Sequence, residues 1–390
     1  MKYCRHCGTQ LQDADRFCSN CGGSCGISQG EPNPAQSKET PNVNISGEKI
    51  MDTLTSKINT LAGGQGAVRV PLSTVFSNIF KKHSRAEAEE IFICGTAKTT
   101  PVLTDTDAAW PRPWLFSRMM LAFVAAFFML HLCCKEFQNL NTYPGLILAG
   151  SFMMPLALVM FFFELNATKN ISFFTTAKVF LVGGCASFLC TLLLFEMFPV
   201  GELDYGGAIL VGIIEEVGKL AIVAYFIRRD KNIQHPINGL LIGAAVGAGF
   251  AAIESAGYAF RILLAAGYND MLDNLILRAV FATGGHVVWA AMSGYAIMIV
   301  KGEQLLTIDF LGNSAFWKLF WVPVALHAIW DMPIEFGSSF YLVQFVLTLT
   351  AWIVIMVLIN NSLAYIAKHV KSNQQQIQEQ VVQETQRTNP

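Results

Sequence analysis

The chain of 390 residues is 53% hydrophobic and only 14% charged, and its mean hydropathy is +0.43. This composition is not that of a soluble domain and predicts an all-α protein that crosses the lipid bilayer several times. Basic and acidic residues nearly balance, with a formal net charge of -1, so the overall charge gives no reason to expect a nucleic-acid partner.

Residues 1–23 contain two CxxC pairs, Cys4 with Cys7 and Cys18 with Cys21. Four thiolates at this spacing can close a tetrahedral zinc site, which leaves no coordination position free for catalysis. Because so short a segment cannot bury a core, the metal would supply its folding free energy. We therefore predict a zinc ribbon with structural zinc. A pair of disulfides is the alternative, and a reducing cytoplasm disfavours it.

Residues 24–110 are expected to form a linker with short cytoplasmic helices. The stretch 24–47 is rich in Ser, Pro, Asn, Gln and Gly, which is typical of a flexible linker. Apolar residues at helical spacing then indicate weak helices near 50–61 and 75–80. Ser84 and Glu87 have the spacing of a capping box, which predicts a helix from there to Glu90.

Residues 111–367 are predicted to form a domain of eight transmembrane helices, because eight apolar stretches each approach the length that a bilayer requires. These stretches cover residues 115–133, 144–163, 178–198, 207–227, 238–260, 279–300, 316–334 and 341–363. Residues 368–390 are polar and Gln-rich, so we expect a disordered tail.

The basic residues predict the orientation of these spans. The N-terminal segment has no apolar signal-peptide core, and Lys and Arg gather in alternate connections, beginning with the one before the first span. The loops 199–206 and 335–340, which lie on the opposite side, contain no Lys or Arg. We therefore expect a multi-pass protein of the cell (inner) membrane with both termini in the cytoplasm.

The fourth predicted span contains two carboxylates and an ammonium, Glu215, Glu216 and Lys219. Ionisable groups inside a bilayer are costly and mark functional sites more often than structural ones. Lys219 is four residues from Glu215 and three from Glu216, so we expect it to neutralise one carboxylate at a time. The other carboxylate would then be able to take or give a proton near neutral pH. A structural ion pair is the alternative.

Three other spans contain polar groups that could meet these carboxylates. They are Glu254 in the fifth span, His286 in the sixth, and His327 with Asp331 in the seventh. The last two are four residues apart, so the aspartate can orient the imidazole, for catalysis or as a structural hydrogen bond. Glycines at four-residue spacing, positions 239, 243 and 247, would let the helices approach closely.

Depth along the helices predicts that these groups share one layer. The depth of each residue follows from its distance to the outer end of its span, at 1.5 Å per residue. Roughly 9–12 Å below the outer surface lie four residues: Glu215, Glu254, His286 and His327. Spans that cross the membrane in opposite directions would place these residues at the same depth only if the residues belong to one layer. We therefore expect a water-accessible pocket that opens toward the outside.

The order of the motifs resembles the PrsW family of intramembrane proteases, over about residues 205–335. The matching motifs are EExxK, FxxxE, a single His and HxxxD, at Glu215, Glu216 and Lys219, Phe250 and Glu254, His286, and His327 and Asp331. The family belongs to a wider set with the CAAX prenyl proteases and bacteriocin-processing enzymes. The resemblance implies an endopeptidase whose partner is a membrane-anchored protein. Family members cut anti-sigma factors on the outer side, which releases a stress response.

With this resemblance, we expect Glu215 to activate the attacking water and Glu216 to share or position its proton. Lys219 would hold their charge in check, and Phe250 would support the site.

His286 and His327 would then polarise the scissile carbonyl or protonate the leaving amine. Asp331 would fix the tautomer of His327, and Glu254 would complete the polar pocket. A catalytic zinc ion held by these four residues is the competing expectation, although the chain has no HExxH motif.

Two other functional classes use similar residues. A proton-coupled transporter or a receptor can relay protons through buried carboxylates and histidines. Transporters often contain internal repeats, however, and each motif occurs once here. A scaffold that has kept the fold without the chemistry agrees less well with the complete set of polar residues.

Overall fold

The computed structural model describes residues 2–3, 10–11, 47–334 and 341–388, and it divides into two units, Met1–Ser46 and Gly47–Pro390. The described part of the first unit is an antiparallel pair of short strands, β1 (Lys2–Tyr3) and β2 (Gln10–Leu11). The four cysteines predicted to bind zinc lie outside the described residues.

The second unit begins with α1 (Gly47–Leu61), α2 (Leu72–Val75), α3 (Arg85–Ile93) and the short 3-10 helix η1 (Leu103–Asp105). The predicted capping box is present, because the Ser84 hydroxyl accepts the Glu87 N–H at 3.2 Å and the Glu87 carboxylate accepts the Ser84 N–H at 2.6 Å. The Tyr295 hydroxyl donates to the Ala62 carbonyl at 3.3 Å. This contact ties the segment after α1 to the helices that follow.

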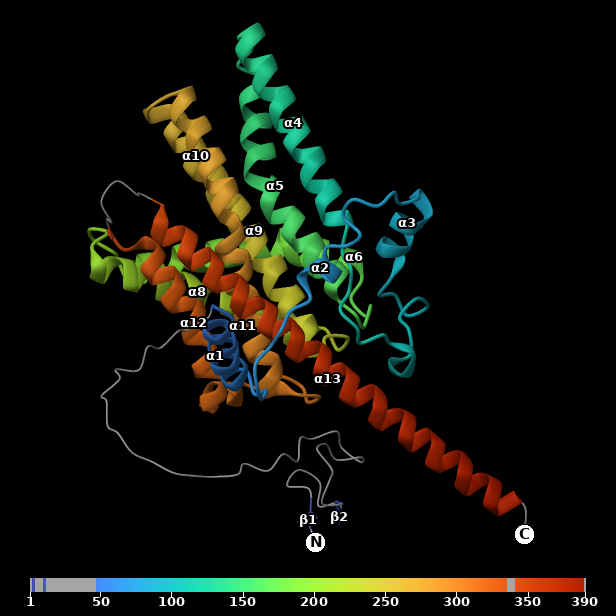
Figure 1. Cartoon of the computed structure of the whole chain (residues 1–390). Helices are drawn as coiled ribbons and strands as arrows, with labels where there is room; N and C mark the ends of the chain where they lie inside the picture. Colours follow the sequence, from blue (N-terminus) through green and yellow to red (C-terminus); the bar gives the residue numbers. More distant parts are fainter. Residues whose placement is uncertain (1, 4–9, 12–46, 335–340, 389–390) are drawn as a thin grey trace, which may run out of the picture. The chain divides into compact units, whose positions relative to one another are not determined.

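The remaining helices pack into one bundle (Figure 1). They are α4 (Leu115–Phe137), α5 (Thr142–Leu165), α6 (Phe173–Lys178), the π-helical turn η2 (Val179–Gly183), α7 (Gly184–Met197), α8 (Tyr205–Arg229), α9 (Pro236–Ala265), α10 (Tyr268–Phe281), the 3-10 turn η3 (Ala282–Gly284), α11 (His286–Lys301), the 3-10 helix η4 (Ile308–Gly312), α12 (Ser314–Asp331) and α13 (Leu342–Thr388). The predicted all-α membrane fold is confirmed.

Six helical segments among the described residues are long and apolar enough to cross a membrane, so the predicted number of eight spans is not confirmed. They are Leu115–Phe137, Thr142–Leu165, Phe173–Met197, Pro236–Ala265, Tyr268–Lys301 and Leu342–Thr385. The helices α8 and α12 are not among them. Both contain ionisable residues of the predicted site, which lower their apolar character.

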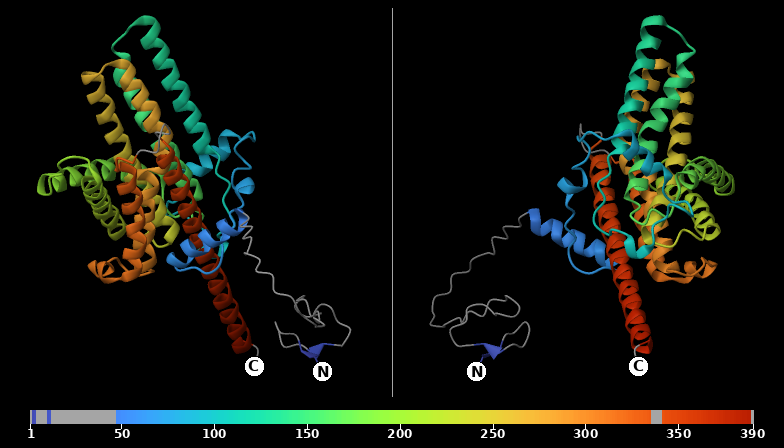
Figure 2. Two further views of the ribbon diagram at one scale, coloured as in Figure 1. Left: turned by 60° about the vertical axis from the view of Figure 1, so that its left-hand side comes forward. Right: turned by 90° about the vertical axis from the view of Figure 1, so that its right-hand side faces the viewer.

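Two predicted boundaries were wrong. Residues 261–278, between the fifth and sixth predicted spans, were expected to form a loop, but residues 268–281 form α10, which places Met271 and Leu275 against α5 and α9. Its apolar residues are spaced three and four apart, as a helix with one buried face requires. The tail was expected to be disordered, whereas α13 continues to Thr388 (Figure 2). Gln and Glu are good helix formers, so a polar composition alone does not end a helix.

Helix α9 is the centre of the bundle, since 94% of its most apolar stretch is buried. Its glycines permit close contact with α11. A Cβ atom at Gly247 would lie only 2.2 Å from the His286 carbonyl oxygen, and one at Gly243 would lie 2.1 Å from that of Ala290. The predicted close approach is therefore present, and it brings the N-terminus of α11 beside the middle of α9.

Candidate active site

Three ionisable residues in the middle of α8, Glu215, Glu216 and Lys219, form the base of the site. Lys219 is fully buried, and its Nζ lies 3.2 Å from Glu215 Oε2 and 2.8 Å from Glu216 Oε1. Lys219 contacts both carboxylates because they lie three and four residues before it on the same helix face, and its single charge balances one of the two, as expected from the sequence. The same Nζ lies 4.2 Å from the centre of the Phe250 ring, a cation–π contact.

His286 is the first residue of α11 and joins α8 to α9. Its Nδ1 lies 2.9 Å from Lys219 Nζ and 3.9 Å from Glu215 Oε2. Its Nε2 lies 3.0 Å from Glu254 Oε2 on α9. One ring nitrogen of His286 therefore contacts the α8 cluster, and the other contacts Glu254 on α9.

His327 on α12 repeats this arrangement. Its Nδ1 lies 3.0 Å from Glu216 Oε1, and its Nε2 lies 3.6 Å from Glu215 Oε2 and 3.4 Å from Asp331 Oδ2. Glu216 thus contacts Nδ1, while Asp331, which the spacing on α12 predicted to lie beside the imidazole, is next to Nε2. The indole of Trp289 stacks on the His327 ring, with centres 4.5 Å apart.

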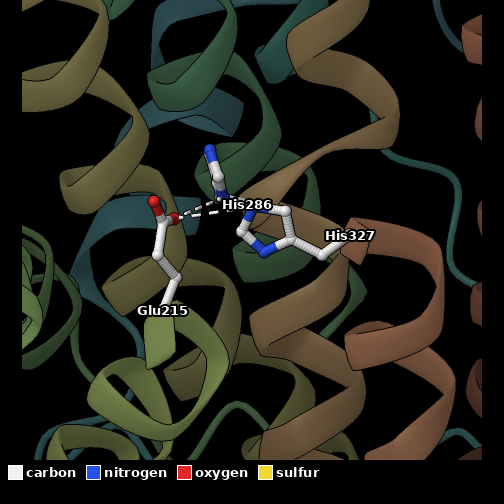
Figure 3. A group of neighbouring side chains, drawn as sticks. All are labelled: Glu215, His286 and His327. Atoms are coloured by element: carbon white, nitrogen blue, oxygen red, sulfur yellow. Dashed lines mark ion pairs between the residues drawn. The ribbon is translucent and has the colours of Figure 1, made fainter. Parts of the chain in front are cut away.

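Figure 3 shows Glu215, His286 and His327 pointing toward one another from three helices. Each offers one ligand atom, and these atoms all lie within 4.8 Å of one another. The ring nitrogens not facing Glu215 are held by carboxylates, Glu254 for one histidine and Glu216 for the other. Carboxylates placed in this way orient metal-binding histidines in many proteins.

This donor set fits a divalent ion such as zinc, since two histidines and one glutamate bind catalytic zinc in known enzymes. The formal charge of the cluster also suits a divalent cation. Four carboxylates and two cationic side chains leave two negative charges when both histidines are neutral. They are Glu215, Glu216, Glu254 and Asp331 against Lys219 and Arg278. Metal binding would require the Lys219 ammonium to leave His286 Nδ1, which it contacts in this structure.

Arg278 on α10 is a part of the site that the sequence reasoning placed in a loop. Its Nη2 forms an ion pair with Glu254 Oε2, and its Nε donates to the Ser255 hydroxyl at 2.9 Å. Its guanidinium also lies 4.5 Å from the centre of the Tyr258 ring. The helical spacing of apolar residues in 268–281 was the signal that could have placed it.

A cavity of about 410 Å³ opens onto this cluster, within the range of ligand sites in proteins. Its lining includes the ionisable residues of the site and the neutral polar residues Ser255, Asn274 and Gln344. Aromatic rings, among them Trp289, Phe281 and Trp330, form much of the remaining wall. Glu215 lines the cavity, whereas Glu216 and Lys219 do not and are both fully buried beneath it. The two neighbouring glutamates therefore have different surroundings.

All eight residues predicted for the bundle site are described, and the structure brings them into one cluster. Glu215, Glu254, His286, His327 and Asp331 line the cavity, and Phe250 packs against the His286 ring with centres 5.1 Å apart. The site residues come from α8, α9, α11 and α12, with Arg278 added from α10.

Comparison with known proteins gives the same family as the motifs. Residues 172–359 match the model of the PrsW family intramembrane metalloproteases, and residues 3–24 match a zinc-ribbon domain. The matched relatives include the protease PrsW of Clostridioides difficile (strain 630), 28% identical over 162 residues, which are 40% of this chain and 64% of that protein. The protease PrsW of Shouchella clausii (strain KSM-K16) is 25% identical over 179 residues, 45% of this chain and 77% of that protein. No solved structure matches.

These matches confirm the resemblance and the zinc ribbon predicted from the sequence. The alignment covers less than two thirds of the length of the Clostridioides protein, and residues 25–171 lie outside both matched families.

Proposed function

Because residues 172–359 match the model of the PrsW family, we propose that this chain is an intramembrane endopeptidase that cleaves a membrane-anchored protein. The observation that carries the proposal is the position of Glu215. It reaches a cavity together with His286 and His327, while Lys219 and Glu216 balance the charge underneath.

In the proposed reaction, Glu215 takes a proton from water while the water oxygen bonds to the scissile carbonyl carbon. Glu215 passes this proton to His327 Nε2, which lies 3.6 Å from its Oε2. The imidazolium then gives the proton to the amine as the carbon–nitrogen bond breaks. Glu216 holds the other nitrogen of His327, and Asp331 lies beside Nε2.

In a metal-dependent version of the reaction, Glu215, His286 and His327 would instead hold the ion that the family name implies, in place of carrying protons. When bound, such an ion polarises a carbonyl oxygen and makes a water molecule more acidic. Glu254 then keeps His286 turned toward the cluster, and Arg278 holds Glu254 in place. We therefore assign Glu254 and Arg278 the role of orienting His286.

For the substrate we propose a membrane-anchored protein cut near the outer end of its span, with anti-sigma factors as one example. The support is the shared depth of the site residues along their helices. The cytoplasmic placement of both termini and the cell membrane as location rest on the distribution of Lys and Arg.

The test is cleavage of a single-span reporter peptide by the full chain in lipid vesicles, followed by mass spectrometry. Glu215→Gln should lower turnover at least about 100-fold, because removal of a general base costs that much, and should leave the unfolding curve unchanged. Glu196→Gln on α7, outside the cavity, is the matched control. Full activity of Glu215→Gln together with an inactive Glu216→Gln would reverse the two roles.

A further inference from the structure

A second cavity, larger and mostly apolar, lies beside the catalytic one. It has a volume of about 900 Å³ and is bounded by α1, α4, α5 and α13. Its walls include Phe116, Met154 and Trp352. Methionine and aromatic side chains make adaptable surfaces for apolar partners. We call this cavity the groove.

A single layer of chain separates the groove from the catalytic cavity. In η3, Ala282 lines the catalytic cavity and the next residue, Thr283, lines the groove. On α13, Gln344 lines the catalytic cavity and Thr348, one turn later, lines the groove. The two parts are in direct contact, because a Cβ atom at Gly284 would lie 2.3 Å from Thr348 Oγ1.

The size of the groove matches part of a transmembrane helix. A cavity of about 900 Å³ can take part of a transmembrane helix, which is about 10 Å across. A span of about 20 residues would therefore still extend past the groove.

The part of the groove formed by α1 and Arg69 is charged. Glu48 and Asp52 of α1 line it there, together with Arg69, whose Nη2 lies 3.1 Å from the first carboxylate and 2.9 Å from the second. Two carboxylates against one guanidinium leave one negative charge. The sequence places α1 on the cytoplasmic side, where membrane spans carry an excess of Lys and Arg. The charge is complementary to that end of a span.

We propose that the groove binds the transmembrane helix of the substrate, with basic residues at its cytoplasmic end near Glu48 and Asp52. The scissile segment reaches the catalytic cavity past η3. This inference rests on the proposed peptidase function for the identity of the partner. The packing of η3 on Thr348 is the barrier that the segment has to pass.

Photo-crosslinking tests the groove without requiring hydrolysis. The full-length Glu215→Gln chain carries benzoylphenylalanine in place of Leu349 or, as the control, Val346. Both side chains belong to α13 and are half exposed, at 50% and 51%, but only Leu349 lines the groove. The probe is a synthetic single-span Leu-Ala peptide with two Lys at one end, mixed with the chain in vesicles.

We expect several-fold more peptide adduct at position 349 than at 346, and less when the two Lys of the probe are replaced by Glu. Equal labelling at the two positions would overturn the inference, because the face would then be an ordinary lipid-facing surface. Phospholipid adducts at 349 without peptide would also overturn it and make the groove a lipid site.

A kinetic arm separates the groove from the chemistry. Leu349→Trp should raise the KM of the single-span peptide about tenfold and leave kcat unchanged, while Val346→Trp changes neither. A water-soluble peptide with the same scissile sequence should be cleaved at the same rate by the Leu349→Trp and Val346→Trp variants. If the wild-type chain cut neither peptide while the crosslinking pattern held, the peptidase proposal would fail and the groove would stand. An unchanged KM in Leu349→Trp together with equal crosslinking at positions 349 and 346 would refute the proposed role of the groove and leave the peptidase proposal intact.

Discussion

Replacement of Lys219 by Met removes the only cation that touches both α8 carboxylates among the described residues. Lys219 and Glu216 are both fully buried, and their charged atoms lie 2.8 Å apart. Glu215 faces the cavity and can be solvated there, but Glu216 cannot. One carboxylate is therefore left uncompensated. Breaking a buried pair in this way costs about 3–5 kcal/mol.

The free energy of unfolding can be measured by titrating the full chain from mild detergent into a denaturing one and following tryptophan fluorescence. The exposed Lys178, replaced by Met, is the control and should change little. The double variant Lys219→Met with Glu216→Leu should recover most of the loss, because replacing both members of a buried pair by apolar residues is often neutral. A loss below about 0.5 kcal/mol in Lys219→Met, the size of an ordinary surface change, would refute the charge balance described here.

Three further predictions concern other parts of the chain. Replacing Cys4 and Cys7 by Ser should remove about one zinc ion per chain by elemental analysis, and full retention of zinc would contradict the ribbon site. Glu164 accepts three backbone N–H groups at the start of α4, so Glu164→Gln should cost about 1–2 kcal/mol of stability and speed hydrogen exchange there; unchanged exchange would argue against the cap. Burial, with the nearby His369 and Lys301, lowers the pKa of His235 from 6.5 to about 4. Since only the unfolded chain then binds this proton, stability should fall as pH drops below 6.5, by about 1.4 kcal/mol at pH 5.5, and His235→Asn should remove that slope.

The sequence was sufficient to predict the meeting of distant motifs, because membrane helices have few ways to bury ionisable groups. His286 and His327 do meet Glu215 in the structure, and Glu254 joins the cluster through His286. Which atoms pair could not be predicted. The contact of Glu216 with His327 Nδ1 depends on how α8 and α12 cross, and helix periodicity contains no information on that.

The part of the site on α10 was missed for a related reason. Asp270 and Asp273 make residues 268–281 too polar to read as a membrane span, so Arg278 was assigned to a loop. A helix that covers other helices at the end of a bundle needs only one apolar face. The groove could not be predicted from the sequence either, because its walls come from four helices and a short loop that are far apart in the chain.

The composition of α8 has a consequence for how the chain enters the membrane during synthesis. Each ionised side chain at the centre of a helix adds about 2.5–3.5 kcal/mol to the free energy of insertion, and α8 carries three of them in its middle. The histidines that pair with its carboxylates belong to α11 and α12, which emerge later. From Lys219 to His327 the ribosome adds roughly 100 residues, which takes about 5–20 s. During that interval α8 has to remain with the insertion machinery or beside α7, and it enters the lipid only together with the helices that complete the site.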